Sequence, residues 1–408
     1  MRNYNQPDVL ITGLGVTSSI GQGKANFSSA LLAGQHTFGV MQRPGRQKET
    51  RFIGAEIPVL SYPEYLSKKL LRKASFSSHV AMVTLYEAWM EAGLAGVDPE
   101  RIGLIIGGSN IQQREMLRTY ETYGERAQFI TPAYGISFMD SDLCGLCTEQ
   151  FGILGLAYTT GGASASGQLA IIQAIQAVLS GQVDVCIALG ALLDISYLEC
   201  QALRSLGAMG TDRYAEEPAR ACRPFDKHRD GFIYGESCAA VVIEHAETAA
   251  SRQINPYAAI TGWAIGMDGN RNPNPSLNGE VQVIQNVLKQ ARLSPQSIDY
   301  INPHGTGSIL GDEIELEAIR QCQLAHTYIN ATKSLIGHGL SAAGTIEIAA
   351  TLLQMKEACL HPTRNLDDPI DDTFNWVRDQ AIAHQIKNAL SLSMGFGGIN
   401  TAICLKKL

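Results

Sequence analysis

The stretch "YTTGGASASGQLAIIQAI", residues 158–175, contains the junction from which the fold of this chain can be read. Glycines and small residues come first, and apolar residues then recur at the spacing of one helix face. Such a passage from a loop into a helix often carries a nucleophile. Because the stretch has no cysteine or histidine, its candidates are Ser164 and Ser166. Ser164 is a catalytic serine, the mark of a disabled site, or part of a tightly packed turn.

On both sides of this junction, short apolar runs alternate with helical patterns. Each run ends in glycine or small residues, which is typical of a buried strand. The sequence predicts strands over 8–16, 102–109, 184–192, 238–245, 258–266, 298–307 and 388–398. It predicts helices over 76–94, 166–181, 279–293, 312–323 and 343–360. This alternation predicts an α/β fold with helices on both faces of the sheet.

The two halves of the chain share a weak internal echo. "VLITGLGVTSSIG" near the start resembles "AAITGWAIGMDG" in the second half, and each is a strand followed by glycine-rich backbone. We predict two α/β halves, 1–250 and 251–408, which pack as one unit because no low-complexity linker separates them. "GLGVTS" has Ser18 where a dinucleotide-binding fingerprint has its third glycine, and the acidic residue expected further on is absent. We therefore expect no nicotinamide cofactor.

Composition and charge exclude several classes of protein. The chain has 408 residues, a net charge of −7 and no long basic run, so we expect no nucleic-acid partner. No apolar run reaches the roughly 18 residues that a membrane span needs, so we expect a cytoplasmic protein without a membrane segment. Cys144 and Cys147 form a CxxC without a second pair, and we interpret them as two thiols on a helix. We expect no bound metal.

Three further segments contain residues that can carry chemistry. "NPHGTGSILGDE" places His304 just past a predicted strand, and "NATKSLIGHGLSAAG" places Lys333 and His338 before a helix that starts with small residues. "SLSMGFGGINTAI" places Gly395 and Phe396 in a glycine-rich turn. Each segment alone has a structural explanation, since a single histidine at a strand end is more often structural than catalytic. Together with the junction around Ser164, they predict one active site.

These segments, with "RPFDKHRDGFIYGE" at 223–236, resemble the β-ketoacyl-acyl carrier protein synthases, the condensing enzymes of the thiolase fold. The resemblance runs from "VLITGLGV" to the C-terminus, and it implies a five-layered α/β fold of two similar halves that is usually dimeric. In that family the catalytic cysteine lies in a segment like "TACASG". Ser164 in "GGASASG" occupies the position of that cysteine, and we interpret Ser166 as a packing residue in the first turn of the helix.

The resemblance also implies roles for the distant residues. His304 and His338 would hydrogen-bond the carbonyl of a malonyl thioester and stabilise the enolate that forms as carbon dioxide leaves. Ser164, His304, Lys333 and His338 are the catalytic residues that the resemblance implies, with Glu347 as a charge partner that would orient Lys333. Gly395 and Phe396 would contribute to the substrate or oxyanion side of the site.

The replacement of cysteine by serine changes the expected reaction. A thiolate forms readily at a helix N-terminus, whereas a serine hydroxyl needs an adjacent general base before it can attack. Acyl loading and condensation should therefore be weak, while decarboxylation does not need the nucleophile. The resemblance narrows to the Ser-for-Cys malonyl-acyl carrier protein decarboxylases of polyketide β-branching cassettes. It implies that malonyl-carrier protein is converted to acetyl-carrier protein, with no cofactor besides the phosphopantetheine arm that the carrier brings.

Two other functions stay open on the sequence. One is a non-catalytic dimer partner, like the chain-length factors that lose the cysteine and shape product length. The other is a serine acyltransferase or hydrolase acting on carrier-protein thioesters, with Ser164 activated by His304 or His338 and backbone amides near Phe396 as the oxyanion hole. We expect a homodimer that is active alone, which would argue against the first of these.

A basic cluster interrupts the acidic chain in "LSKKLLRKASFSSH". It consists of Lys68, Lys69, Arg72 and Lys73. Its position matches the carrier-docking helix of the resembled family, and acyl carrier proteins are acidic, so the cluster could steer one to the enzyme. A solvated helix face explains the same charges equally well.

Overall fold

A computed structural model describes residues 9–271 and 273–408 of the chain. Residue 8, at the start of the first predicted strand, and the beginning of the predicted half 1–250 lie outside the described residues. The strands are β1 Val9–Ser18, β2 Gly21–Gln22, β3 Phe38–Val40, β4 Ile53–Ala55, β5 Ile102–Gly107, β6 Ala157–Thr160, β7 Val185–Gly190, β8 Tyr234–Gly235, β9 Ser237–His245, β10 Ala258–Met267, β11 Tyr300–Asn302, β12 Tyr328–Ile329, β13 Cys359–Leu360, β14 Asn375–Trp376, β15 Ile382–Ala383, β16 Asn388–Gly395 and β17 Ile399–Lys406. The helices are α1 Lys24–Leu32, α2 Lys68–Leu71, α3 Phe76–Glu91, α4 Gln113–Tyr123, α5 Tyr134–Ser137, α6 Ser141–Phe151, α7 Ser166–Leu179, α8 Tyr197–Ser205, α9 Ala246–Ser251, α10 Leu277–Ala291, α11 Ile309–Gln321, α12 Lys333–Ile336 and α13 Ala343–Glu357.

The two echoing segments, β1 and β10, pair antiparallel at the centre of the main sheet. From β1 the order runs outward through β9, β7, β5 and β6, and from β10 through β17, β16, β11, β12 and β14. In each direction the first two pairings are antiparallel and the next two are parallel. The two halves of the chain therefore repeat one topology. The position of the joint near residue 250 stays a prediction.

The shared Ile-Thr-Gly of the echo has a structural reason. The register shifts between Ile11 and Gly13 in β1, and between Ile260 and Gly262 in β10. A Cβ on Gly13 would lie 3.0 Å from a backbone oxygen of α3, and one on Gly262 would lie 2.7 Å from a backbone oxygen of α10. Glycine thus lets an outer helix approach the bulged strand closely in each half.

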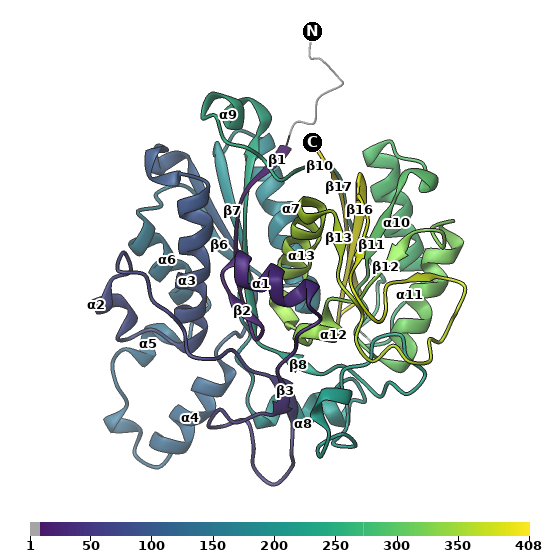
Figure 1. The fold of residues 1–408 in the computed structure, drawn as a ribbon. Coiled ribbons are helices and arrows are strands. Elements are labelled where there is room, and N and C mark those ends of the chain that lie inside the picture. Colours follow the sequence, from purple (N-terminus) through teal and green to yellow (C-terminus); the bar gives the residue numbers. More distant parts are fainter. Residues whose placement is uncertain (1–8, 272) are drawn as a thin grey trace.

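Five layers follow from this repeated topology (Figure 1). Helices α3 and α6 cover the outer face of the N-terminal strands, and α10 and α11 cover the outer face of the C-terminal strands. Helices α7 and α13 lie side by side between the two sets of strands and form the buried middle layer. The predicted α/β fold with five layers and two similar halves is confirmed.

The N-termini of the two middle helices meet in matching turns. Gly162–Ala165 precedes α7 and Gly339–Ala342 precedes α13, and in each the second residue has positive φ, 48° at Ala163 and 51° at Leu340. A Cβ on Gly167 would lie 2.7 Å from the backbone nitrogen of Thr345, so the helices touch through backbone. This packing places the junction that contains Ser164 against the segment that follows His338.

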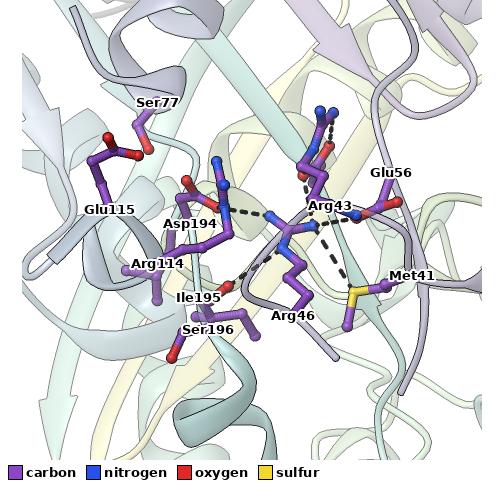
Figure 2. A network of polar contacts seen from close by, with 12 residues as sticks. Met41, Arg43, Arg46, Glu56, Ser77, Arg114, Glu115, Asp194, Ile195 and Ser196 are labelled. Carbon is purple, nitrogen blue, oxygen red and sulfur yellow. Dashed lines mark hydrogen bonds and ion pairs between the residues drawn. The ribbon is translucent and has the colours of Figure 1, made fainter. Parts of the chain in front are cut away.

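A buried network of ion pairs joins several loops of the N-terminal half (Figure 2). Arg46 is fully buried, and its guanidinium contacts Asp194 at 2.8 Å and Glu236 at 2.6 Å. Arg114, at the start of α4, reaches the same oxygen of Asp194 at 2.8 Å. Since Asp194 lies in the loop that joins β7 to α8, the network ties this loop to α4 and to the chain around β3.

The predicted elements differ from the observed ones mainly around loops. The predicted strand 298–307 is a strand only over Tyr300–Asn302, because a glycine-rich loop begins there. Strand β17 was not predicted. Cys144 and Cys147 are free, buried thiols on α6, as interpreted from the sequence. Within the described ranges, no helix has both the length and the apolar character that a membrane crossing requires.

Candidate active site

The turn that presents Ser164 is held by the hydroxyl of Ser166. The backbone N–H of Gly162 donates to Ser166 Oγ at 2.8 Å, and this hydroxyl donates to the carbonyl of Ala163 at 2.7 Å. Gly395, at the end of β16, packs against the same turn, and a Cβ there would lie 2.4 Å from the carbonyl oxygen of Gly162. The interpretation of Ser166 as a packing residue alone was therefore wrong, because its hydroxyl fixes the turn around Ser164.

His338 lies next to Ser164, with 2.9 Å between its Nε2 and Ser164 Oγ. The backbone N–H of Leu340 donates to the other ring nitrogen, Nδ1, at 3.3 Å. A neutral imidazole carries one proton, so the hydrogen bond from Leu340 assigns that proton to Nε2. His338 therefore donates to Ser164 and does not accept its proton.

Both histidines are kept neutral by their surroundings. Burial, and then the nearby charge of Lys333, hold the pKa of His338 well below its ordinary value. Burial, Lys333 and His338, in that order, do the same to the pKa of His304. The two rings are 5.5 Å apart between centroids and nearly perpendicular. The pair thus offers two imidazole N–H donors without positive charge.

Lys333 donates a hydrogen bond to the backbone of His304. Its side chain is almost fully buried, and its Nζ donates both to the carboxylate of Glu347 and to the backbone carbonyl of His304. Burial raises the pKa of Glu347 to about 7, while the ammonium of Lys333 opposes this rise. Lys333 therefore ties the backbone of His304 to Glu347, and within the described structure neither Lys333 nor Glu347 lines the cavity that holds the two imidazoles. A catalytic role for Lys333 stays a prediction.

Two carboxylates that the sequence analysis did not single out shape the loop of His304. Glu315 accepts the backbone N–H groups of His304 at 2.5 Å and Gly305 at 2.8 Å. Asp312 accepts the backbone N–H of Gly307 at 3.0 Å. The sequence carries a signal for both acids, because Asp312 lies within "NPHGTGSILGDE" and Glu315 follows this segment by two residues, and glycine-rich loops expose backbone donors.

A single cavity of about 820 Å³ brings the predicted residues together. It is lined by Ser164, His304, His338, Gly395 and Phe396. The ring of Phe396 is 43% exposed, so it lies where the cavity meets the surface. A carbonyl oxygen placed between the two imidazoles in this cavity would accept hydrogen bonds from neutral donors, which stabilise negative charge as it forms.

The basic cluster lies elsewhere. Lys68, Lys69, Arg72 and Lys73 are exposed in and just after α2, and none of them lines the cavity. None forms an ion pair within the described part of the chain, so the charges face solvent. Among the described residues, no group of histidine, cysteine and acidic side chains has an arrangement that could hold a metal ion.

Comparisons with known proteins agree with this geometry. Residues 6–249 match the profile of the β-ketoacyl synthase N-terminal domain, and residues 257–367 match that of the C-terminal domain. The chain is 68% identical over 408 residues to the polyketide biosynthesis malonyl-ACP decarboxylase PksF of Bacillus subtilis, an alignment that covers 100% of this chain and 98% of that protein.

Solved structures of ketosynthases have the same fold as this chain. A β-ketoacyl synthase from Burkholderia phymatum superposes with a TM-score of 0.89 at 28% identity, covering 99% of this chain and 100% of the other. A type II polyketide ketosynthase in complex with its acyl carrier protein gives a TM-score of 0.86 at 25% identity, with the same coverage. On the family profiles, the full-length identity and the shared fold, the chain belongs to the β-ketoacyl synthase family.

Proposed function

We propose that the protein decarboxylates malonyl-acyl carrier protein to acetyl-acyl carrier protein in polyketide biosynthesis. The observation that carries the proposal is the pair of neutral imidazoles, His304 and His338, which face one cavity beside a serine that receives a hydrogen bond. The 68% identity to a malonyl-ACP decarboxylase supports the same reaction. We further propose that the acetyl group serves as the donor in β-branching, as the resemblance of the Ser164 segment implies.

The reaction follows from the two donors. When the malonyl group binds, its thioester carbonyl accepts the N–H of each imidazole and takes the place of Ser164 Oγ as the acceptor of the His338 N–H. As the bond to the carboxylate carbon breaks, its electron pair moves toward this carbonyl, and an enolate forms while carbon dioxide leaves. Each donor then faces a full negative charge, and hydrogen bonds stabilise the transition state most where such charge develops.

Ser164 is proposed to stand where condensing relatives have their cysteine. Its hydroxyl oxygen accepts a hydrogen bond from Nε2–H of His338, so the nearest imidazole cannot serve as its general base in this tautomer. No hydrogen bond joins Ser164 to His304 in the described structure. This arrangement disfavours the serine acyltransferase alternative. The intact cavity with both histidines disfavours a non-catalytic chain-length partner.

Incubation with malonyl-carrier protein tests this function. The mass of the intact carrier should fall by one carbon dioxide, and the enzyme should gain no covalent acyl group. A carrier mass that stays unchanged would refute decarboxylation. An acylated Ser164 would favour the acyltransferase.

We propose that the basic cluster around α2 docks the carrier. Reversing two charges, Arg72→Glu with Lys73→Glu, should raise the KM for malonyl-carrier protein several-fold with little change in kcat, because steering acts on encounter. The effect should shrink at high salt. A matched control is Lys289→Glu with Lys387→Glu, exposed lysines outside the cluster that give the same change in net charge. Equal KM changes in the two variants would contradict docking at α2.

We also propose that the protein is a homodimer. Strand β6 ends the order of the main sheet, and beyond β5 it has no neighbour among the described strands. Large apolar side chains are exposed on and just before this strand, with Leu154 70% and Tyr158 40% exposed. An open edge beside exposed apolar side chains favours pairing with a second copy of the same chain.

A further inference from the structure

The proposed reaction has a requirement that condensation lacks, and the following inference rests on the proposed function. When a condensing enzyme forms the enolate, the carbon of the enolate attacks an acyl group. In a decarboxylase that same carbon must take up a proton to become the methyl group of the acetyl product. The cavity should therefore contain a group that holds a proton near neutral pH.

One carboxyl group in the cavity has no part in the site described above. Glu280 lies in the first turn of α10 and is only 2% exposed, and it lines the same cavity as Ser164, His304 and His338. Its Oε2 is buried without a hydrogen-bond partner, and no ion pair to Glu280 occurs among the described residues. A buried carboxyl group left this way is costly unless it is neutral.

The neighbours of Glu280 favour its protonated form. Burial comes first, and the carboxylates of Glu315, Asp268 and Asp312 then raise the pKa of Glu280 well above its ordinary value. Each of these three acids has its own donors. Backbone N–H groups bond Glu315 and Asp312, and the side-chain amide of Asn400 donates to Asp268 at 2.7 Å. Burial also raises the pKa of Glu315 to about 8 and that of Asp312 to about 6. Of these four acids, Glu280 is the one with a buried carboxyl oxygen that receives no hydrogen bond, so it gains most from carrying a proton.

The other groups of the site are already engaged. The N–H groups of His304 and His338 are needed to hold the enolate oxygen, and both imidazoles are neutral. Lys333 is bound to Glu347 and to the carbonyl of His304, and it does not line the cavity. Among the neighbouring charges, that of Glu315 raises the pKa of Glu280 most. Glu315 also accepts the backbone N–H of His304, so it is close to both Glu280 and the imidazole pair.

We propose that Glu280 is the acid that protonates the enolate. After carbon dioxide has left, the O–H bond of the Glu280 carboxylic acid breaks and a C–H bond forms at the enolate carbon. Glu280 is left as a carboxylate, and it takes a proton from water before the next turnover. The cavity allows this exchange because it opens to the surface beside Phe396 and Leu310, which are 43% and 45% exposed.

The test compares wild type with Glu280→Gln, which keeps the shape and removes the acid, and with Glu280→Asp, which keeps an acid. Reactions run in a 1:1 mixture of H₂O and D₂O, and the mass of the acetyl-carrier protein gives the ratio of hydrogen to deuterium added. This ratio reports the proton-transfer step even when another step is slower. The control is Glu317→Gln, an exposed carboxylate on α11.

We expect Glu280→Gln to change the isotope ratio, Glu280→Asp to restore it toward wild type, and Glu317→Gln to leave it unchanged. Acetyl formation by Glu280→Gln should slow by about 100-fold or more where protonation limits the rate. Wild-type activity should also fall as pH rises through the raised pKa of Glu280, because the acid is then lost, and Glu280→Gln should lack this decline.

An unchanged isotope ratio in Glu280→Gln would overturn the proposal, whether or not the variant is slower, since slowing alone would indicate a structural role. A melting temperature close to wild type shows that the variant is folded. If wild type itself releases no carbon dioxide, the proposed function fails. If wild type is active and only the isotope test is negative, the role of Glu280 fails alone.

Discussion

His338→Ala should lower the rate of malonyl decarboxylation by about 100- to 1,000-fold, and His304→Ala should act similarly. Each substitution removes one of the two N–H donors that face the developing enolate, and the loss of one such donor costs about 3 to 4 kcal/mol of transition-state stabilisation. The effect should appear in kcat more than in KM, because the oxygen bears its full charge only after carbon dioxide begins to leave. Intact-mass kinetics with malonyl-carrier protein measure it.

The matched control is His326→Ala, an exposed histidine away from the cavity, which should keep wild-type kinetics. The double variant of His304 and His338 should lose less than the product of the two single effects, since both donors bind one oxygen. Activity of His338→Ala within about threefold of wild type would contradict the role assigned to the pair.

Asp194→Ala should destabilise the protein by about 3 to 5 kcal/mol. Its carboxylate contacts the guanidinium groups of Arg46 and Arg114, which are 0% and 5% exposed (Figure 2). Its loss leaves the buried Arg114 without an ion-pair partner among the described residues and removes one of the carboxylates that hold Arg46. Denaturant unfolding with matched slopes measures the change.

The control is Asp184→Ala, which breaks an exposed ion pair with Arg101 and should have a much smaller effect. Equal losses from the two variants would contradict the importance of burial. Leu193 and Ile195 flank Asp194 and line the cavity, so Asp194→Ala should also weaken activity before the protein unfolds.

The repeated α/β organisation was predictable because its signals are local. The helices at 166–181 and 343–360 were predicted from apolar spacing and are observed as α7 and α13. The strand over 298–307 was predicted too long, because the loop "PHGTG" follows the apolar residues directly and was counted with them. In the structure this loop is not part of the strand. Strand β17 was missed since it follows a glycine-rich turn whose glycines dominate the local pattern.

The site was predictable in its members but not in its hydrogen bonding. The segments around Ser164, His304, Lys333 and His338 carry family motifs, and the structure brings them together. The direction of the hydrogen bond between Ser164 and His338 depends on the backbone N–H of Leu340, which only the turn after His338 places there. No residue pattern encodes that contact.

Glu280 and Arg46 show why other parts could not be predicted. An acidic residue in the first turn of an amphipathic helix is ordinary, so nothing in "LNGEVQVIQ" indicates that Glu280 is buried. Arg46 lies in a segment without periodicity, and its partners Asp194 and Glu236 are more than 140 residues away in sequence. Both environments arise from tertiary packing alone.

The central claim is that the decarboxylation chemistry rests on the histidines and does not need the hydroxyl of Ser164. The most direct test is the intact mass of malonyl-carrier protein after incubation with Ser164→Ala. We predict that the carrier still loses carbon dioxide, at a rate within about tenfold of wild type, and that no acyl group remains on the enzyme. A carrier that keeps its malonyl group with this folded variant would contradict the account and make Ser164 essential to the reaction.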